Sequence, residues 1–193
     1  MKPIVLASQS PRRKEILSYF KLPFIQVSPS FDEDAVEPFP DPVKFAHYLS
    51  AQKALSVKDS YPDSVILSSD TIVYFKGTYF AKPTNREHAF QIIKALSNNT
   101  HQVITSVTAL MGDKMLQDYG LTNVTFNDLT DKEINSFLDL NLWADKAAGY
   151  TPQGAGSLLV KSVEGCYYNV LGLPVNALNR VLTPLGLNLW HAD

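Results

Sequence analysis

The chain has 193 residues, of which 45% are hydrophobic and 19% are charged, and its formal net charge is −2 at pH 7. A chain of this length can bury a full core, built as one unit or as two small lobes around a cleft. The small negative charge and the lack of a long basic run argue against a general nucleic-acid binder, because such a protein neutralises phosphates over a broad basic face.

Cysteine content and hydropathy indicate the kind of cellular compartment in which we expect the protein. Cys166 is the only cysteine, so the chain can form no internal disulfide and no cysteine-based zinc site, and we expect a reducing, cytoplasmic setting. The sequence has no run of about 18 apolar residues, the length that a membrane span requires. We therefore expect no targeting signal and no membrane partner.

The first predicted elements suggest an anion site. Residues 4–6 form an apolar strand, Ser10 is suited to cap a helix, and that helix is expected over residues 11–20. The free N–H groups of its first turn would lie beside the guanidinium groups of Arg12 and Arg13, and both kinds of donor suit phosphate oxygens. The alternative is that both arginines are only solvated side chains of a first helical turn.

Strands and helices continue to alternate along the chain. Apolar runs between turn signals predict further strands at residues 24–27, 65–67, 72–75, 78–80, 103–111, 115–126 and 157–163. Helical spacing and end signals predict helices at residues 42–58, 84–96 and 130–138, and a last helix between Pro174 and Gly186. Capping boxes open two of these helices, one formed by Thr84 with Glu87 and one by Thr130 with Glu133.

This order of elements predicts an α/β fold. We expect one elongated mixed sheet flanked by helices, with a cleft between two lobes. The sequence has no internal repeat and no low-complexity tract. A single domain that spans residues 1–193 is therefore expected.

Two acids and four cations are the candidates for chemistry. Asp70 follows the strand predicted at residues 65–67, where we expect that strand to end, and Glu33 lies in an acidic loop. The cations are Arg12, Arg13, Lys53 and Lys82. Divalent ions such as Mg²⁺ take carboxylates and phosphate oxygens, while Lys and Arg would neutralise the charge that repels an attacking water. Taken singly, Asp70 could be a turn or cap residue, the acidic loop a solvated one, and Lys82 a surface lysine.

Other kinds of site have weaker support. Ser8 and Ser10 lack a Gly-x-Ser-x-Gly context and the chain has no P-loop run, so serine-hydrolase and P-loop chemistry are rejected. His101 has no Cys or second His at ligand spacing and is expected to be structural. Gln153 lies in a glycine-containing loop and can both donate and accept, as recognition of a base edge requires, although the segment could be a plain loop.

Five motifs together resemble those of one known family. They are Leu6-Ala-Ser-Gln-Ser-Pro-Arg-Arg-Lys-Glu-Ile-Leu17, Ser69-Asp70-Thr71, Lys82-Pro83, Asp145-Lys-Ala-Ala-Gly-Tyr-Thr-Pro-Gln-Gly154 and Asn169-Val-Leu-Gly-Leu-Pro174. In this order, over nearly the whole chain, they resemble the Maf family. The resemblance implies an inosine-triphosphatase-like fold and a nucleoside triphosphate pyrophosphatase, which cuts between the α and β phosphates with a divalent cation (Mg²⁺, Mn²⁺ or Co²⁺). It also makes a homodimer plausible.

The resemblance assigns a role to each candidate residue. Asp70 would be the base that activates water, and Glu33 would help Asp70 to place the metal. The phosphates of the nucleoside triphosphate would be held by Ser8, Arg13, Lys53 and Lys82. These roles agree with the interpretation of the charged residues given above, which rests on the chemistry of the side chains alone.

Three further residues bear on the choice of substrate. Family members that act on dTTP and UTP carry Arg, Thr and Gln where this chain has Arg12, Thr71 and Gln153, whereas members that act on 7-methyl-GTP typically carry an aromatic residue, Gln and Glu. Gln153 can pair with the mixed donor and acceptor edge of thymine or uracil. The resemblance thus implies that dTTP and UTP, and modified pyrimidine nucleotides with them, are the substrates.

Three departures and two alternative functions stand beside this expectation. Ala148 and Ser106 stand where the family usually has Gly, and Pro152 replaces an apolar residue, which bears on base preference but removes no charged candidate. One alternative is a nucleotide-binding regulator of cell division and septum formation without significant turnover. The other is a purine pyrophosphatase that acts on ITP or 7-methyl-GTP.

Overall fold

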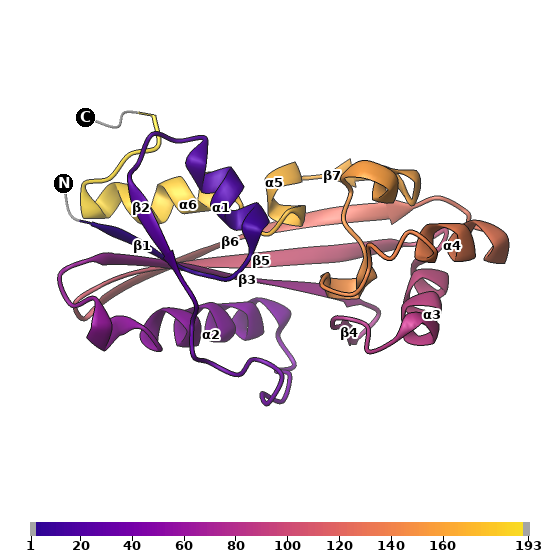
Figure 1. The fold of residues 1–193 in the computed structure, drawn as a ribbon, viewed down its shortest axis with the longest axis horizontal. Helices are drawn as coiled ribbons and strands as arrows, with labels where there is room; N and C mark the ends of the chain where they lie inside the picture. The colour runs from indigo at the N-terminus through magenta and orange to yellow at the C-terminus, as the bar shows by residue number, and fades with distance from the viewer. Residues whose placement is uncertain (1–2, 191–193) are drawn as a thin grey trace.

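One long mixed sheet organises the computed structural model, which describes residues 3–190 (Figure 1). In that part of the chain the sheet has seven strands in the order β2-β1-β3-β5-β6-β7, with β4 beside β3. The strands are β1 (Ile4–Ala7), β2 (Phe24–Val27), β3 (Val65–Phe75), β4 (Thr78–Phe80), β5 (Thr100–Met111), β6 (Lys114–Phe126) and β7 (Val160–Glu164). β1 runs parallel to β2 and β3, and the other pairs are antiparallel, so the α/β prediction is confirmed.

Helices cover both faces of the sheet. They are α1 (Pro11–Ser18), α2 (Pro42–Leu55), α3 (Arg86–Leu96), α4 (Asp131–Leu138), α5 (Tyr167–Val170) and α6 (Val175–Leu182). Figure 1 shows α1 and α6 over one face and α2 over the other, while α3 and α4 lie together at the far end. None of the helices within residues 3–190 has the length and apolarity needed to cross a membrane.

The sheet is long because three strands continue where β1 and β2 stop. β1 pairs with β3 only from Ile4 to Leu6, yet β3 runs on to Phe75 beside β5. The 13 residues of β6 reach about 40 Å at the usual rise per residue. Side chains that follow β1 therefore meet the middle of β3, which β1 no longer pairs with, and a ligand can bind in the crevice at the carboxyl end of a parallel strand.

Capping residues in the sequence predicted the starts of α1 and α4 correctly. The side chain of Ser10 accepts a hydrogen bond from the N–H of Arg13, at 3.4 Å, and Pro11 is the first helical residue. Thr130 and Glu133 form the expected capping box at the start of α4. The predicted box of Thr84 is wrong, because Asn85 is the residue that caps α3 and its side chain accepts from the N–H of His88, at 2.8 Å.

Two strand predictions are also corrected. Residues 65–67 and 72–75 belong to one strand, so Asp70 lies in its middle and not at its end. The polar side chains of Ser68 and Ser69 hid this continuity, but they are buried and donate to the carbonyls of Ser50 and Gly172. Residues 157–158 belong to a 3-10 turn (Gly154–Leu158), and β7 begins only at Val160.

Candidate functional site

A cavity of about 700 Å³ opens at the carboxyl end of β1, where β3 continues beyond its pairing with β1 and stays paired with β5. Its wall includes the segment from Ser8 to Arg13, the acidic loop, and side chains from α2, β3 and the turn before α6. Of the predicted site residues, the wall contains Ser8, Arg12, Arg13, Glu33, Lys53, Asp70, Thr71 and Lys82. The structure therefore brings together eight of the nine residues singled out from the sequence.

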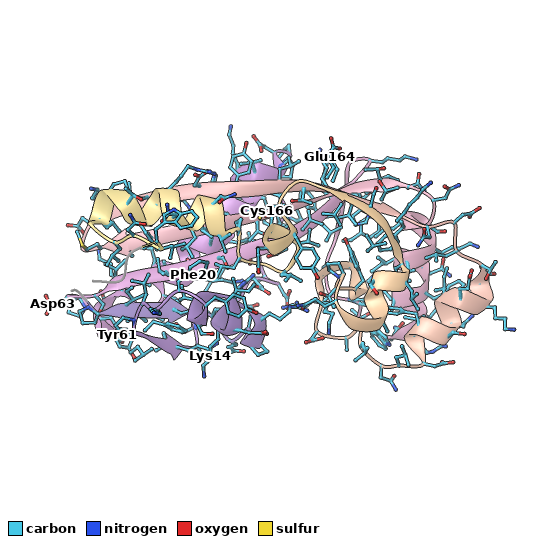
Figure 2. The ribbon with its side chains drawn as sticks, turned by 90° about the horizontal axis from the view of Figure 1, so that it is seen from above. Lys14, Phe20, Tyr61, Asp63, Glu164 and Cys166 are labelled. Atoms are coloured by element: carbon cyan, nitrogen blue, oxygen red, sulfur yellow. The ribbon has the colours of Figure 1, made fainter. Side chains whose placement is uncertain are left out.

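The start of α1 presents hydrogen-bond donors to the cavity. The hydroxyl of Ser8 accepts from the N–H of Ser10, at 3.2 Å, and from Nη1 of Arg13, at 3.4 Å. Within residues 3–190 no acceptor takes the hydroxyl proton of Ser8, so this proton can be donated to a ligand oxygen. Lys14, the next residue along the helix, is exposed and points away from the body of the protein (Figure 2).

Arg13 is fixed by three different parts of the chain. Its Nε donates to the carbonyl of Gly172, at 2.9 Å, its Nη2 to the hydroxyl of Thr71, at 3.2 Å, and its Nη1 to Ser8. Three of the five N–H donors of a guanidinium are used in this way, and two remain for a ligand. Burial lowers the pKa of Arg13, and the nearby carboxylates of Asp70 and Glu33 oppose that effect. A guanidinium stays charged, so a rigid cation faces the cavity.

A lysine from α2 joins the two candidate acids. Lys53 is buried, and its ammonium forms ion pairs with the carboxylates of both Glu33 and Asp70. Lys82 approaches the other oxygen of Glu33, with Nζ 2.7 Å from Oε1. Burial of Glu33 would raise its pKa, but Lys53 and Lys82 outweigh that effect and lower the pKa of this carboxyl to about 2. Glu33 is therefore a fixed negative charge over the whole physiological range.

Asp70 has the surroundings of a carboxylate that can take up a proton. It is only 5% exposed, and burial raises its pKa above the ordinary value, against the opposing charge of Lys53. Of the two carboxylate oxygens of Asp70, only Oδ1 accepts a hydrogen bond from residues 3–190, and its donor is Lys53. A raised pKa moves a carboxylate toward the range in which a general base works well.

The donor set suits a divalent ion that arrives with phosphates. Residues 3–190 contain no group of three or more His, Cys, Asp or Glu side chains that could hold a metal by themselves. Glu33 and Asp70 nevertheless contact one ammonium between them, so their oxygens lie close together on the cavity wall. Mg²⁺ is commonly bound through one or two carboxylates together with phosphate oxygens, and this pair fits that pattern.

Of the other residues discussed from the sequence, Arg12 lies on the cavity wall, whereas Gln153 and His101 do not. Arg12 lines the cavity, and its buried Nε has no hydrogen-bond partner within residues 3–190. Gln153 is exposed at the start of a 3-10 turn and does not line the cavity. His101 is buried against the hydroxyl of Tyr150, at 2.6 Å, as expected of a structural histidine, and burial lowers its pKa to about 4.

The three departures from the family pattern also have defined positions. Ser106 lies opposite Asp70 on β5, and its hydroxyl is 2.7 Å from Nδ1 of His47 on α2. Ala148 adopts a left-handed backbone conformation, with φ of 53°, which costs an L-residue about 1–2 kcal/mol relative to glycine. Pro152 is buried next to Gln153.

The turn at Gly172 is a part of the site that reasoning from the sequence missed. Its carbonyl accepts from Arg13 and from the hydroxyl of Ser69, which lie 159 and 103 residues away along the chain. The motif from Asn169 to Pro174 was the available signal, but no chemistry was assigned to it. Contacts over such sequence distances leave no periodic pattern that could reveal them.

Gly172→Ala is expected to weaken both stability and nucleotide binding. The φ of Gly172 is 98°, and a Cβ would lie 3.2 Å from Oγ1 of Thr71 and 3.4 Å from Nε of Arg13. The strain is expected to cost about 1–3 kcal/mol in urea unfolding, and the displaced guanidinium should raise the KM for nucleotide. Gly77→Ala is the matched control, because its φ of 85° is also positive but a Cβ there would have no atom of residues 3–190 other than its chain neighbours within 4 Å. That variant should lose stability and keep the KM, and equal KM values in both variants would contradict this role of Gly172.

Comparison with known proteins shows the family to which the chain belongs. Residues 3–185 match the family described as Maf-like protein. The dTTP/UTP pyrophosphatase of Chlamydia caviae is 42% identical over 192 residues, 98% of each chain. The dTTP/UTP pyrophosphatase of Bacillus cereus is 38% identical over 192 residues, 100% of each chain. The Staphylococcus aureus Ham1 protein superposes with a TM-score of 0.47 at 12% identity, covering 66% of this chain and 73% of that one. From the match over residues 3–185 and these relatives, the chain belongs to the Maf family.

Proposed function

We propose that the protein hydrolyses dTTP and UTP to the nucleoside monophosphate and pyrophosphate. The observation that carries the proposal is the buried carboxylate of Asp70, which faces a 700 Å³ cavity together with Arg13 and Lys53. A polyanion binder has no need of a carboxylate in its site, whereas hydrolysis needs a base. The names of the relatives from Chlamydia caviae and Bacillus cereus support the same activity.

In the proposed reaction, a water attacks the α phosphorus and Asp70 accepts its proton. The bond between the α phosphorus and the oxygen that bridges it to the β phosphorus breaks, and pyrophosphate leaves. Arg13, with two N–H donors unused, and Lys53 and Lys82 balance the negative charge on the phosphates. The hydroxyl proton of Ser8 is available to a phosphate oxygen at the start of α1.

We propose that a divalent cation (Mg²⁺, Mn²⁺ or Co²⁺) is held by Asp70, Glu33 and the phosphates. When bound, such an ion neutralises phosphate charge and lowers the pKa of water. The chain itself keeps Glu33 ionised through Lys53 and Lys82, so that one ligand is always charged. Removal of divalent ions with a chelator is expected to abolish turnover.

For recognition of the nucleobase, we propose that Arg12, Thr71 and Gln153 determine the preference for thymine and uracil. Arg12 and Thr71 line the cavity, which supports their part in this role. Gln153 lies outside the cavity wall, so its role is supported only by the resemblance of its motif. We further propose a cytoplasmic setting and a homodimer as the working state.

The test is pyrophosphate release by the purified protein across dTTP, UTP, CTP, GTP, ITP and 7-methyl-GTP, with Mg²⁺ or Mn²⁺. The proposal expects dTTP and UTP to be preferred. Preference for a purine nucleotide would keep the reaction and overturn the specificity. Nucleotide binding without release of pyrophosphate from any of the six would contradict the enzyme and favour a nucleotide-binding regulator of septum formation.

A further inference from the structure

A chain of hydrogen bonds leads from Arg13 into the core. Nη2 of Arg13 donates to Oγ1 of Thr71, at 3.2 Å, and Oγ1 of Thr71 lies 2.9 Å from Oγ1 of Thr105. The hydroxyl of Thr105 donates to the carbonyl of Asn169, at 2.8 Å. Thr71 and Thr105 are directly opposed residues of β3 and β5, so the pairing of the two strands sets this contact.

The carbonyl of Asn169, at the end of this series of hydrogen bonds, fixes which hydroxyl donates at each step. A carbonyl oxygen can only accept, so the single hydroxyl proton of Thr105 is used on Asn169. The short contact between the two threonine hydroxyls then requires Thr71 to donate to Thr105. Thr71 in turn offers a lone pair to Arg13 and has no proton left for a ligand.

Asn169 is itself held firmly. It is fully buried, its Oδ1 accepts from the N–H of Thr105, at 3.1 Å, and its Nδ2 donates to the carbonyl of Val103, at 2.8 Å. Gly120 on β6 makes room for it, because a Cβ there would lie 2.6 Å from Oδ1 of Asn169. The chain of hydrogen bonds therefore ends on a group that cannot shift without breaking several buried contacts.

From these contacts we propose that Thr105 is a positioning residue that orients Arg13 through Thr71. Thr105 is fully buried and does not line the cavity, so it does not touch the substrate. Thr71 then donates no hydrogen bond to the nucleobase, so the part proposed for it in the preference for thymine and uracil comes from the shape of its side chain at the cavity wall and not from its hydroxyl proton. The inference rests on the proposed function, because it takes the phosphates as the partners of Arg13.

The test compares Thr105→Val and Thr105→Ser with Thr108→Val. Valine keeps the shape of threonine but ends the chain of hydrogen bonds, whereas serine keeps the hydroxyl. Thr108 is a control on the same strand with the same full burial, but its hydroxyl bonds to Ser50, at 2.8 Å, and not to the chain that ends at Arg13. The readouts are the Kd for dTTP by calorimetry, the KM, the kcat and the urea midpoint.

Thr105→Val is expected to weaken dTTP binding about tenfold and to raise the KM by the same factor, with kcat within about twofold of the wild type. The reason is that Thr71 loses the acceptor that fixes its hydroxyl, so its lone pair is no longer held toward Arg13. Thr105→Ser should bind dTTP with a Kd close to that of the wild type. Thr108→Val should lose stability but keep the wild-type Kd. In an Arg13→Lys background, Thr105→Val should have no further effect on the Kd. An unchanged Kd in Thr105→Val, an equal loss in Thr108→Val, or additive losses with Arg13→Lys would overturn the proposal.

Calorimetry separates this inference from the proposed function. If the wild type binds dTTP but releases no pyrophosphate, the proposed function fails, and the Kd values still decide whether Thr105 acts through Arg13. If the wild type turns over dTTP and the Kd is unchanged in Thr105→Val, the enzyme stands and the positioning role fails.

Discussion

Asp70→Asn is expected to lower the rate of pyrophosphate release by about 10²–10⁴-fold, the usual contribution of a general base. Asparagine has nearly the same shape, and its carbonyl can still accept from Lys53, but it cannot take a proton from water. The substitution also removes one negative charge from a cavity that receives a polyanion. The Kd for dTTP measured without divalent ions should therefore not rise, and calorimetry together with a pyrophosphate assay checks both quantities.

Asp63→Asn is the matched control for this loss. Asp63 is exposed and lies at the end of the molecule, away from the middle of the sheet (Figure 2). It does not line the cavity, so the same change of charge there should leave both kcat and KM unaltered. If Asp70→Asn retained turnover close to that of the wild type, another group would have to be the base.

Lys53→Met is expected to lower the free energy of unfolding by about 3–5 kcal/mol near neutral pH. The lysine is 8% exposed and pairs with two carboxylates, and removal of one partner of a buried ion pair leaves uncompensated charge. Turnover should be lost as well, because Asp70 and Glu33 would no longer be held together. Urea unfolding and the pyrophosphate assay measure the two effects.

Lys82→Met is the control for stability. The side chain of Lys82 is 52% exposed, and Glu33 is its only ion-pair partner among the described residues, so its removal should cost about 1 kcal/mol or less. Equal losses in Lys53→Met and Lys82→Met would contradict the central place given to Lys53.

The deficit of Lys53→Met should shrink as the pH falls from 6 to 3. In the wild type the pKa of Glu33 is about 2, below its ordinary value of 4.5, so its contribution to stability is present above 4.5 and is lost as the pH falls toward 2. Without Lys53 the two carboxylates have raised pKa values and gain stability when they are protonated. Both changes bring the unfolding curves together at acid pH, and a constant deficit would show that the loss is one of packing.

Local features of the fold followed directly from the sequence. The start of α1 needs only Ser10 and Pro11, and the start of α4 needs only Thr130 and Glu133, because a cap and its partners lie within four residues. The place of Asp70 within β3 did not follow, since the polar residues beside it are satisfied by carbonyls far away in the chain. A pattern of apolar residues cannot report such partners.

The candidate site also has features that could be predicted from the sequence and features that could not. The charged residues could be chosen by chemical type, and the structure gathers them around one cavity. The hydrogen bonds that orient Arg13 come from Gly172 and Thr71, and neither bond could be expected from the chemistry of a short segment. Gln153 shows that chemical type alone does not place a side chain, because this candidate for recognition of a base edge lies outside the cavity wall.

Hydrolysis of dTTP in water enriched in ¹⁸O tests the central claim most directly. If water attacks the α phosphorus with Asp70 as the base, mass spectrometry will find one ¹⁸O atom in dTMP and none in pyrophosphate. The label should enter neither product in Asp70→Asn over the same time. Labelled pyrophosphate with unlabelled dTMP, or dTDP with orthophosphate, would place the attack on another phosphorus and contradict the account.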